Sequence, residues 1–168
     1  MSRRRFYASP DEINGSTVKL SRDETHHLTR VLRLNLGAEV FVFDGRGREY
    51  RCSFLALEHS RARLEISDTL LDKVEPAVHV TLAQALAKGE KFDFIVQKAT
   101  ELGASAIAPL VTARTDVKLS DERSEKRLDR WRRISLEAMK QCGRRRLVEI
   151  ESPLTLKDFL DAIRAREA

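Results

Sequence analysis

The stretch KGEKFDFIVQKATELGAS, residues 88–105, decides the fold that the sequence predicts. Its apolar residues recur at spacings of three and four, the pattern of a helix with one buried face; they are Phe92, Ile95, Val96, Ala99 and Leu102. Gly103 follows and predicts the end of the helix, because the residue after a helix often needs a left-handed backbone. Apolar runs at 78–86 and 104–111 lie on either side. Strand, helix and strand in this order predict a parallel β-α-β unit.

A second amphipathic helix is expected after a polar connection at residues 112–126. Its apolar positions again lie three and four apart; they are Leu128, Trp131, Ile134, Ala138 and Cys142. Gly143 marks its end. The place of Trp131 on this stripe favours a core residue over a platform for stacking bases.

Beyond this helix the alternation of strand and helix continues. Residues 146–150 predict a third strand. Thr155 followed by Asp158 has the spacing of a helix cap and predicts a last helix. Strands that alternate with helices in this way predict an open α/β layer.

The first half of the chain has the period of two that is typical of strands. A short strand is predicted at 16–20, and Ser21 followed by Glu24 has the spacing of a helix start. The apolar face of that helix is expected to consist of Leu28, Val31 and Leu32. Two strands are predicted around the turn at 44–47, and another at 62–66. These strands predict a small antiparallel β-barrel.

A domain boundary is expected in the charged segment at 68–78, which contains Pro76 and separates the two patterns. We therefore predict an α+β protein of two domains, 1–73 and 74–168. The first is the antiparallel β-barrel and the second is part of an α/β domain.

The composition is that of a soluble globular protein. The chain has 168 residues, of which 42% are hydrophobic, and no apolar run approaches the roughly 20 residues that cross a bilayer. Residues 1–7 are basic and lack the apolar core of a signal peptide. A cytoplasmic protein without a membrane segment is therefore expected.

Metal and disulfide chemistry are not expected. Cys52 and Cys142 lie far apart in the sequence, which favours two free thiols. His26 and His27 are adjacent, so they cannot point the same way from one helix, and no further His or Cys lies at ligand spacing. We predict no metal site.

Positive charge is concentrated in two places. The formal net charge is +5, which makes an anionic partner plausible. Arg3, Arg4 and Arg5 cluster at the start, and residues 123–146 hold ten Arg or Lys against three acidic residues. Charge alone leaves two interpretations open, a solvated helix face and a nucleic-acid contact.

No reaction is named by a general motif, because the sequence has no Walker loop, dinucleotide fingerprint, nucleophile elbow or paired-histidine zinc signature. Six segments together nevertheless resemble one family, the RsmE ribosomal RNA uridine-N3 methyltransferases. They are RRRFY (3–7), HHLTRVLRL (26–34), FDGRGREY (43–50), KGEKFDFIVQKATELG (88–103), RTDVKL (114–119) and RWRRISLEAMKQCGR (130–144). The resemblance covers essentially all the residues present.

The resemblance implies a PUA-like RNA-binding barrel followed by a SPOUT methyltransferase domain. It implies transfer of a methyl group from S-adenosylmethionine to N3 of a uridine in 16S ribosomal RNA, by a homodimer that acts on the small ribosomal subunit. The knotted, glycine-rich cofactor loops of the family have no counterpart before Ala168. We therefore expect the cofactor-binding residues to lie beyond it and the 168-residue chain alone to be inactive.

Candidate site residues lie in the matching motifs. Arg144 and Arg114 sit at the ends of elements, where side chains can reach a ligand, and they are our catalytic candidates. Glu101 and Gln141 are expected in the active cleft, although Glu101 could simply pair with Lys98 on its own helix. RNA-binding candidates are Arg3, Arg4, Arg5, Arg30 and Arg33.

Two other functional classes remain open from the sequence. The chain could be a non-catalytic RNA-binding fragment, or a basic α/β module whose helix face binds protein. Salt-dependent binding of RNA would separate the RNA-binding classes from the last one.

Overall fold

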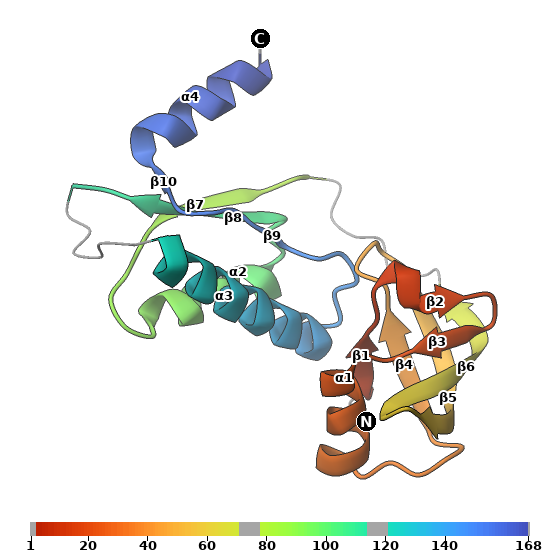
Figure 1. The fold of residues 1–168 in the computed structure, drawn as a ribbon. Helices are drawn as coiled ribbons and strands as arrows, with labels where there is room; N and C mark the ends of the chain where they lie inside the picture. Colours follow the sequence, from red (N-terminus) through yellow and green to blue (C-terminus); the bar gives the residue numbers. More distant parts are fainter. Residues whose placement is uncertain (1–2, 71–77, 114–120, 168) are drawn as a thin grey trace. The chain divides into compact units, whose positions relative to one another are not determined.

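The computed structural model describes residues 3–70, 78–113 and 121–167, and the chain divides into two compact units (Figure 1). The first comprises Met1–Glu75 and Gly143–Arg146, and the second comprises Pro76–Cys142 and Leu147–Ala168. The predicted boundary between residues 73 and 74 lies outside the described residues.

The first unit is built on a curled six-stranded sheet in the order β1-β4-β5-β6-β3-β2 (Figure 1). Its strands are β1 (Arg5–Tyr7), β2 (Ile13–Asn14), β3 (Thr17–Lys19), β4 (Glu39–Phe43), β5 (Glu49–Glu58) and β6 (Arg61–Leu70), and a short helix, η1 (Pro10–Glu12), precedes β2. Every neighbouring pair is antiparallel except β1 and β4, which are parallel. The strands predicted at 16–20, 62–66 and around the turn at 44–47 are confirmed. The sequence did not reveal β1 and β2, because two or three residues are too few to show a period.

A helical segment follows Ser21, as its capping spacing predicts. The Ser21 hydroxyl accepts the backbone N–H of Glu24 at 3.2 Å, and α1 (Arg22–His26) continues into a wider turn, η2 (His27–Val31). The Leu32 N–H donates to the carbonyl of His27, five residues back. Such a turn holds an extra residue and shifts the faces of the helix. Leu28 is buried, but Val31 is 60% exposed and Leu32 is also exposed, so the prediction that these two face the core is wrong.

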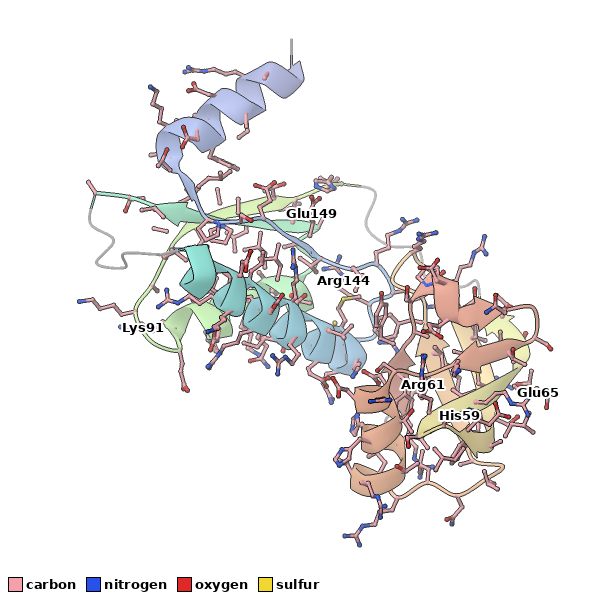
Figure 2. All side chains as sticks on the ribbon, in the orientation of Figure 1. His59, Arg61, Glu65, Lys91, Arg144 and Glu149 are labelled. Carbon is pink, nitrogen blue, oxygen red and sulfur yellow. The ribbon has the colours of Figure 1, made fainter. Side chains whose placement is uncertain are left out.

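The β5–β6 hairpin turns tightly at His59 and Ser60, both with positive φ, as two-residue hairpin turns require. Arg61 follows the turn (Figure 2). Its guanidinium donates to the carbonyl of Leu20 at 2.7 Å and pairs with Glu12 at 2.8 Å. The side chain thereby ties the hairpin to segments from the start of the chain.

The second unit contains the predicted β-α-β unit. Strand β7 (Thr81–Ala85), helix α2 (Lys91–Leu102) and strand β8 (Ala106–Val111) follow one another, and β7 pairs with β8 in parallel. Gly103 ends α2 with a φ of 100°. Two short strands, β9 (Glu149–Ile150) and β10 (Leu154–Thr155), also pair with β8 in parallel.

Two boundaries differ from the predictions, and a third agrees with them. Helix α3 (Asp121–Cys142) begins inside the segment expected to be a polar loop, because charged residues are good helix formers and mask the start of the helix. The strand expected at 146–150 is confined to β9, since residues 143–146 belong to the first unit. Helix α4 (Leu156–Glu167) starts where Thr155 accepts the backbone N–H of Asp158 at 3.1 Å, as predicted.

Helices α2 and α3 share one apolar core. Phe92 and Trp131 pack with their ring centroids 4.6 Å apart, and Trp131 is only 2% exposed. The indole Nε1 donates to Oδ1 of Asp93 at 3.2 Å, so its polar edge is satisfied. Trp131 is therefore a core residue, as predicted. Leu102 is not, because it is 87% exposed at the end of α2.

Candidate active site and RNA-contacting residues

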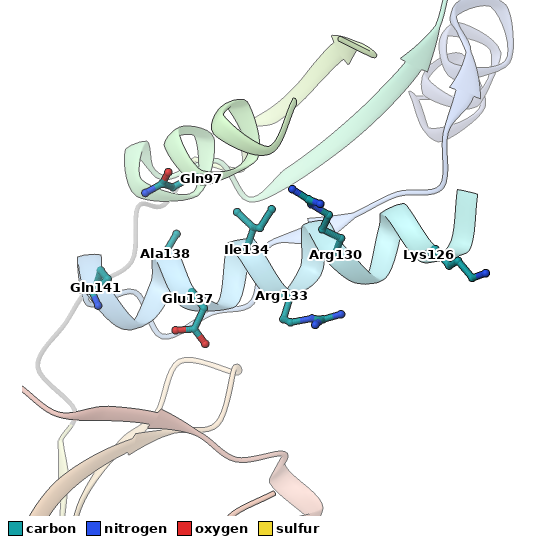
Figure 3. Close-up of a pocket in the computed structure, with 8 residues that line it drawn as sticks. All are labelled: Gln97, Lys126, Arg130, Arg133, Ile134, Glu137, Ala138 and Gln141. Atoms are coloured by element: carbon teal, nitrogen blue, oxygen red, sulfur yellow. The ribbon is translucent and has the colours of Figure 1, made fainter. Parts of the chain in front are cut away.

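A groove of about 660 Å³ runs along α3 beside α2 within the second unit (Figure 3). Ile134 and Ala138 supply apolar surface. Its polar lining consists of two amides, one carboxylate and three cations, namely Gln97, Gln141, Glu137, Lys126, Arg130 and Arg133. The groove is therefore predominantly basic.

Two polar contacts hold α2 and α3 together beside this groove. The Thr100 and Ser135 hydroxyls are 3.0 Å apart and buried. Arg130 pairs with Asp93 at 2.5 Å through an oxygen that does not bond Trp131. These contacts fix the distance between the helices, so the groove is largely preformed.

One of the two predicted cleft residues, Gln141, lines the groove together with Gln97. The other, Glu101, is in contact with Gln97. The Gln97 amide donates to one carboxylate oxygen of Glu101 at 3.0 Å, and the Lys98 ammonium donates to the other at 2.7 Å. Sequence analysis missed Gln97, because a single amide on a helix carries no signal of its own.

The environment of Glu101 makes it a poor proton acceptor. The hydrogen bond from Lys98 lowers the pKa of Glu101, with a smaller contribution from the Gln97 amide. A general base works best with a pKa near the operating pH, so the lowered pKa argues against this role. The pairing with Lys98, which the sequence left open, is present. It positions the Glu101 carboxylate to accept a hydrogen bond from the Gln97 amide.

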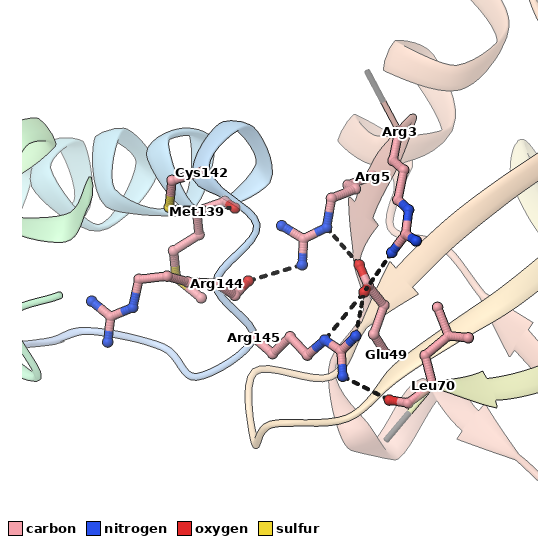
Figure 4. A network of polar contacts seen from close by, with 8 residues as sticks. All are labelled: Arg3, Arg5, Glu49, Leu70, Met139, Cys142, Arg144 and Arg145. Atoms are coloured by element: carbon pink, nitrogen blue, oxygen red, sulfur yellow. Dashed lines mark hydrogen bonds and ion pairs between the residues drawn. The ribbon is translucent and has the colours of Figure 1, made fainter. Parts of the chain in front are cut away.

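Arg144 lies in the part of the chain that joins the first unit (Figure 4). Gly143, with a φ of 85°, ends α3 as predicted. The Arg5 guanidinium donates to the Arg144 carbonyl at 2.9 Å. This bond fixes the backbone of Arg144 and leaves the direction of its half-buried side chain to other contacts.

A buried carboxylate anchors the same segment. Glu49 accepts from the Nε of Arg5 and from Nε and Nη2 of Arg145, the latter two at 3.1 and 2.9 Å. Arg145 also donates to the carbonyl of Leu70 at 2.7 Å. The Arg145–Glu49 pair therefore holds in place the segment that contains Arg144. Nothing in the sequence pointed to Glu49, since its partners are distant in the chain.

The predicted RNA-binding arginines separate into two groups. Arg3, Arg4, Arg30 and Arg33 are exposed, and Arg33 has a φ of 51°, which is unusual for a residue with a side chain. Arg5 is instead buried against Glu49. Its guanidinium is occupied within the fold, which favours a structural role over a contact with phosphate.

Arg114, the second catalytic candidate, lies outside the described residues. Within the ranges that are described, no three His, Cys, Asp or Glu side chains gather as metal ligands, and both cysteines are free thiols. Over the same ranges, no helix has the length and apolar character needed to span a membrane.

Two protein-family models match this chain. A model described as an RNA methyltransferase domain matches residues 74–168, and one described as an RNA methyltransferase PUA domain matches residues 20–67. The first covers α2, α3 and the parallel sheet, and the second covers strands β4 and β5 and most of β6.

Curated relatives carry one name, ribosomal RNA small subunit methyltransferase E. The protein of Synechocystis is 39% identical over 97% of this chain and 52% of its own length. That of Bacillus subtilis is 33% identical over 76% of this chain and 50% of its own length. The chain thus spans about half the length of the curated relatives it matches.

Solved structures agree with these relatives. A protein from Legionella pneumophila, solved with S-adenosylmethionine, is 30% identical with a TM-score of 0.89, over 96% of this chain and 66% of that one. The ribosomal RNA small subunit methyltransferase E of Neisseria gonorrhoeae, also bound to S-adenosylmethionine, is 34% identical with a TM-score of 0.86. That alignment covers 95% of this chain and 65% of the other.

Proposed function

We propose that the complete protein methylates N3 of a uridine in 16S ribosomal RNA, because this chain belongs to the RsmE family of RNA methyltransferases. S-adenosylmethionine is the methyl donor in this proposal. The observation that carries it is the match of a PUA-type and a methyltransferase model, in that order, to a chain with a curled β-sheet followed by a parallel α/β sheet.

The chemistry of uridine determines what the site must do. N3 of uridine holds a proton near neutral pH, so the enzyme must help remove it and align the nitrogen with the methyl group. Negative charge then develops on the neighbouring carbonyl oxygens, where a fixed cation lowers the barrier. An arginine can supply this charge but not accept the proton, because its guanidinium does not lose a proton in proteins.

We assign this electrostatic role to Arg144, with Arg114 as the second candidate. Support for Arg144 comes from its position directly after the end of α3 and from the Arg5 hydrogen bond that fixes its backbone. A cation whose main chain is held in advance loses less conformational freedom when the substrate binds. Gln141 is proposed as a polar contact within the cleft, and Glu101 acts through Gln97.

The groove along α3 does not fit the methyl donor. S-adenosylmethionine carries a positive sulfonium, whereas the groove along α3 is lined by Lys126, Arg130 and Arg133. Like charges at close range repel. We therefore propose that the cofactor is held by other parts of the protein, as the family resemblance implies, and that residues 1–168 contribute mainly RNA contacts and the Arg144 cation.

The RNA contacts are proposed at exposed arginines of the first unit. Arg4, Arg30 and Arg33 are exposed, and Arg3 is 56% exposed although its guanidinium also lies 3.9 Å from Glu49. Such groups bind phosphates without reading sequence and release counterions when they do so. An RNA-binding fragment without catalysis remains the second candidate, since none of these contacts needs the cofactor.

Assembly and location follow the family resemblance. We propose a homodimer in the cytoplasm. Exposed apolar side chains in the second unit support an association of this kind, because large apolar groups at a surface favour contacts with another chain; they include Phe94, Leu102, Leu156 and Leu160. Sedimentation over a wide concentration range tests it, and a strictly monomeric complete protein would contradict the dimer.

Mass spectrometry tests the reaction directly. Small ribosomal subunits that lack the modification would be incubated with the complete protein and S-adenosylmethionine, and the RNA digested to nucleosides. N3-methyluridine is the expected product, with protein omitted as the control. Its absence with folded protein would refute the proposed reaction, whereas RNA binding without methylation would favour the second candidate.

A further inference from the structure

A second cavity, of about 510 Å³, lies within the first unit where the β2–β3 turn approaches the β4–β5 turn. Its volume falls in the range of sites for small ligands. The residues that matter for its chemistry are Ile13, Gly15, Asp44, Arg46, Arg48 and Tyr50. None of them has been used by the candidate site described above.

Asp44 gives this cavity a buried acceptor. The residue ends β4 and is only 5% exposed. Its Oδ1 accepts the backbone N–H of Arg46 at 2.7 Å and that of Arg48 at 3.0 Å, which closes the turn. Within the described residues, no group donates to Oδ2. Oδ2 therefore keeps its full capacity to accept hydrogen bonds from a ligand in the cavity that brings N–H groups.

The remaining groups add an aromatic wall and a cationic rim. Tyr50 is buried, and its hydroxyl makes no hydrogen bond to the described part of the chain. Arg46 and Arg48 are exposed, and their guanidinium groups form no ion pair with any described residue. Hydrogen-bond acceptors on the buried side suit a nucleotide base, and cations on the exposed side suit the phosphates that flank this base.

We propose that this cavity binds one unstacked nucleotide of single-stranded RNA, with guanine preferred, an inference that rests on the proposed action on RNA. Single-stranded RNA is read through the hydrogen-bonding edges of unstacked bases. Guanine presents two adjacent donors, N1–H and the 2-amino group, to the free oxygen of Asp44. Uracil presents one N–H between two carbonyl oxygens, which the carboxylate repels. Arg46 and Arg48 hold the flanking phosphates.

Short RNA strands test the base preference. Fluorescence anisotropy would measure binding of the pentaribonucleotides UUGUU and UUUUU, and of a third strand with inosine at the centre. We expect the guanine strand to bind about tenfold more tightly than the uracil strand. The inosine strand, which lacks the 2-amino group, should fall between them. Equal affinities for the three strands would overturn the proposal.

Two substitutions separate base recognition from phosphate contacts. Asp44→Asn keeps an oxygen for the two backbone N–H groups of the turn and replaces Oδ2 with an amino donor, so the guanine preference should disappear. Arg46→Ala should weaken the binding of all three strands by the same factor and leave the preference for guanine intact. A preference for guanine retained by folded Asp44→Asn would overturn the role of Asp44. The wild-type ranking decides the proposal even where a variant fails to fold.

The cavity and the proposed reaction can fail separately. Guanine preference together with absence of N3-methyluridine would refute the reaction and leave the cavity as an RNA site. N3-methyluridine formation together with equal pentanucleotide affinities would refute the cavity and leave the reaction.

Discussion

Arg145 and Glu49 form a buried ion pair across 96 positions of the sequence. Two guanidinium nitrogens of Arg145 lie 2.9 and 3.1 Å from one carboxylate oxygen, and both side chains are 3% exposed. Arg5 bonds the other oxygen of Glu49. One carboxylate therefore bonds two buried arginines and joins residues 143–146 to the sheet of the first unit.

Glu49→Ala should destabilise the fold strongly, because it removes the carboxylate that the buried guanidinium groups of Arg5 and Arg145 both bond. Breaking a buried pair in this way costs about 3–5 kcal/mol. Glu39→Ala is a matched control, since Glu39 and Arg51 form an exposed pair at 3.9 Å that is worth at most about 1 kcal/mol. Urea unfolding of both variants measures the difference, and equal losses of unfolding free energy would contradict the importance of the buried network.

Local sequence patterns predicted much of the fold, but they did not predict the buried network around Glu49. The spacing of Phe92, Val96 and Ala99 is a property of one helix and fixes its buried face without knowledge of the rest of the chain. Glu49 looks like an ordinary charge in an alternating strand. Its burial depends on Arg5 and Arg145, which only the tertiary fold brings to it. The same holds for the wider turn before Leu32, which changes the buried face of a helix whose start was predicted correctly.

The two cysteines should differ in reactivity toward iodoacetamide. Cys52 is buried in the core of the first unit, and this burial raises its pKa to about 12. Only the thiolate reacts, so near pH 8 Cys142, which is partly exposed, should be alkylated first. Peptide mass spectrometry over time would measure both rates, with Cys142→Ser as the control. Labelling of native Cys52 as fast as that of Cys142 would contradict its burial.

The raised pKa of Cys52 also predicts a pH dependence of stability. The folded state keeps the thiol proton up to about pH 12, whereas an unfolded cysteine loses it near its ordinary pKa of 9.0. The stabilisation is complete below pH 9 and is lost as the pH rises toward 12. Cys52→Ala should therefore show a shallower loss of unfolding free energy above pH 9 than the unmodified protein. Parallel slopes for the two proteins in urea titrations would show that Cys52 does not contribute.

Replacing Arg3 and Arg4 together by Ala should flatten the salt dependence of RNA binding, because both are exposed. Each lost phosphate contact lowers the slope of log K against log salt by about 0.7 for a single strand. Filter binding of a 16S fragment at several salt concentrations measures it. Arg5→Ala is the contrasting variant, since it should lower stability rather than the slope. An unchanged slope in the Arg3 and Arg4 double variant would remove these residues from the RNA interface.

The candidate site was harder to predict than the fold for a physical reason. Motif positions identify which residues matter in a family, but not what their neighbours do to them. Glu101 was expected in the active cleft from its motif, and only the structure shows that contacts with Lys98 and Gln97 lower its pKa. Arg5 looked the same as Arg3 and Arg4 in sequence, yet only Arg5 lies within β1, where its guanidinium is buried against Glu49.

Arg144→Ala in the complete protein should lower methylation far more than RNA affinity. The proposed guanidinium acts on charge that develops only in the transition state, and loss of such a group costs about 100-fold or more in turnover. The hydrogen bond from Arg5 is kept in the variant, because it goes to the backbone carbonyl of residue 144. Arg146→Ala removes the same charge two residues away and serves as the control. Single-turnover methylation and RNA binding would be measured for both variants. If Arg144→Ala lowered turnover no more than Arg146→Ala does, or lowered only RNA affinity, Arg144 would be a phosphate contact rather than a catalytic residue.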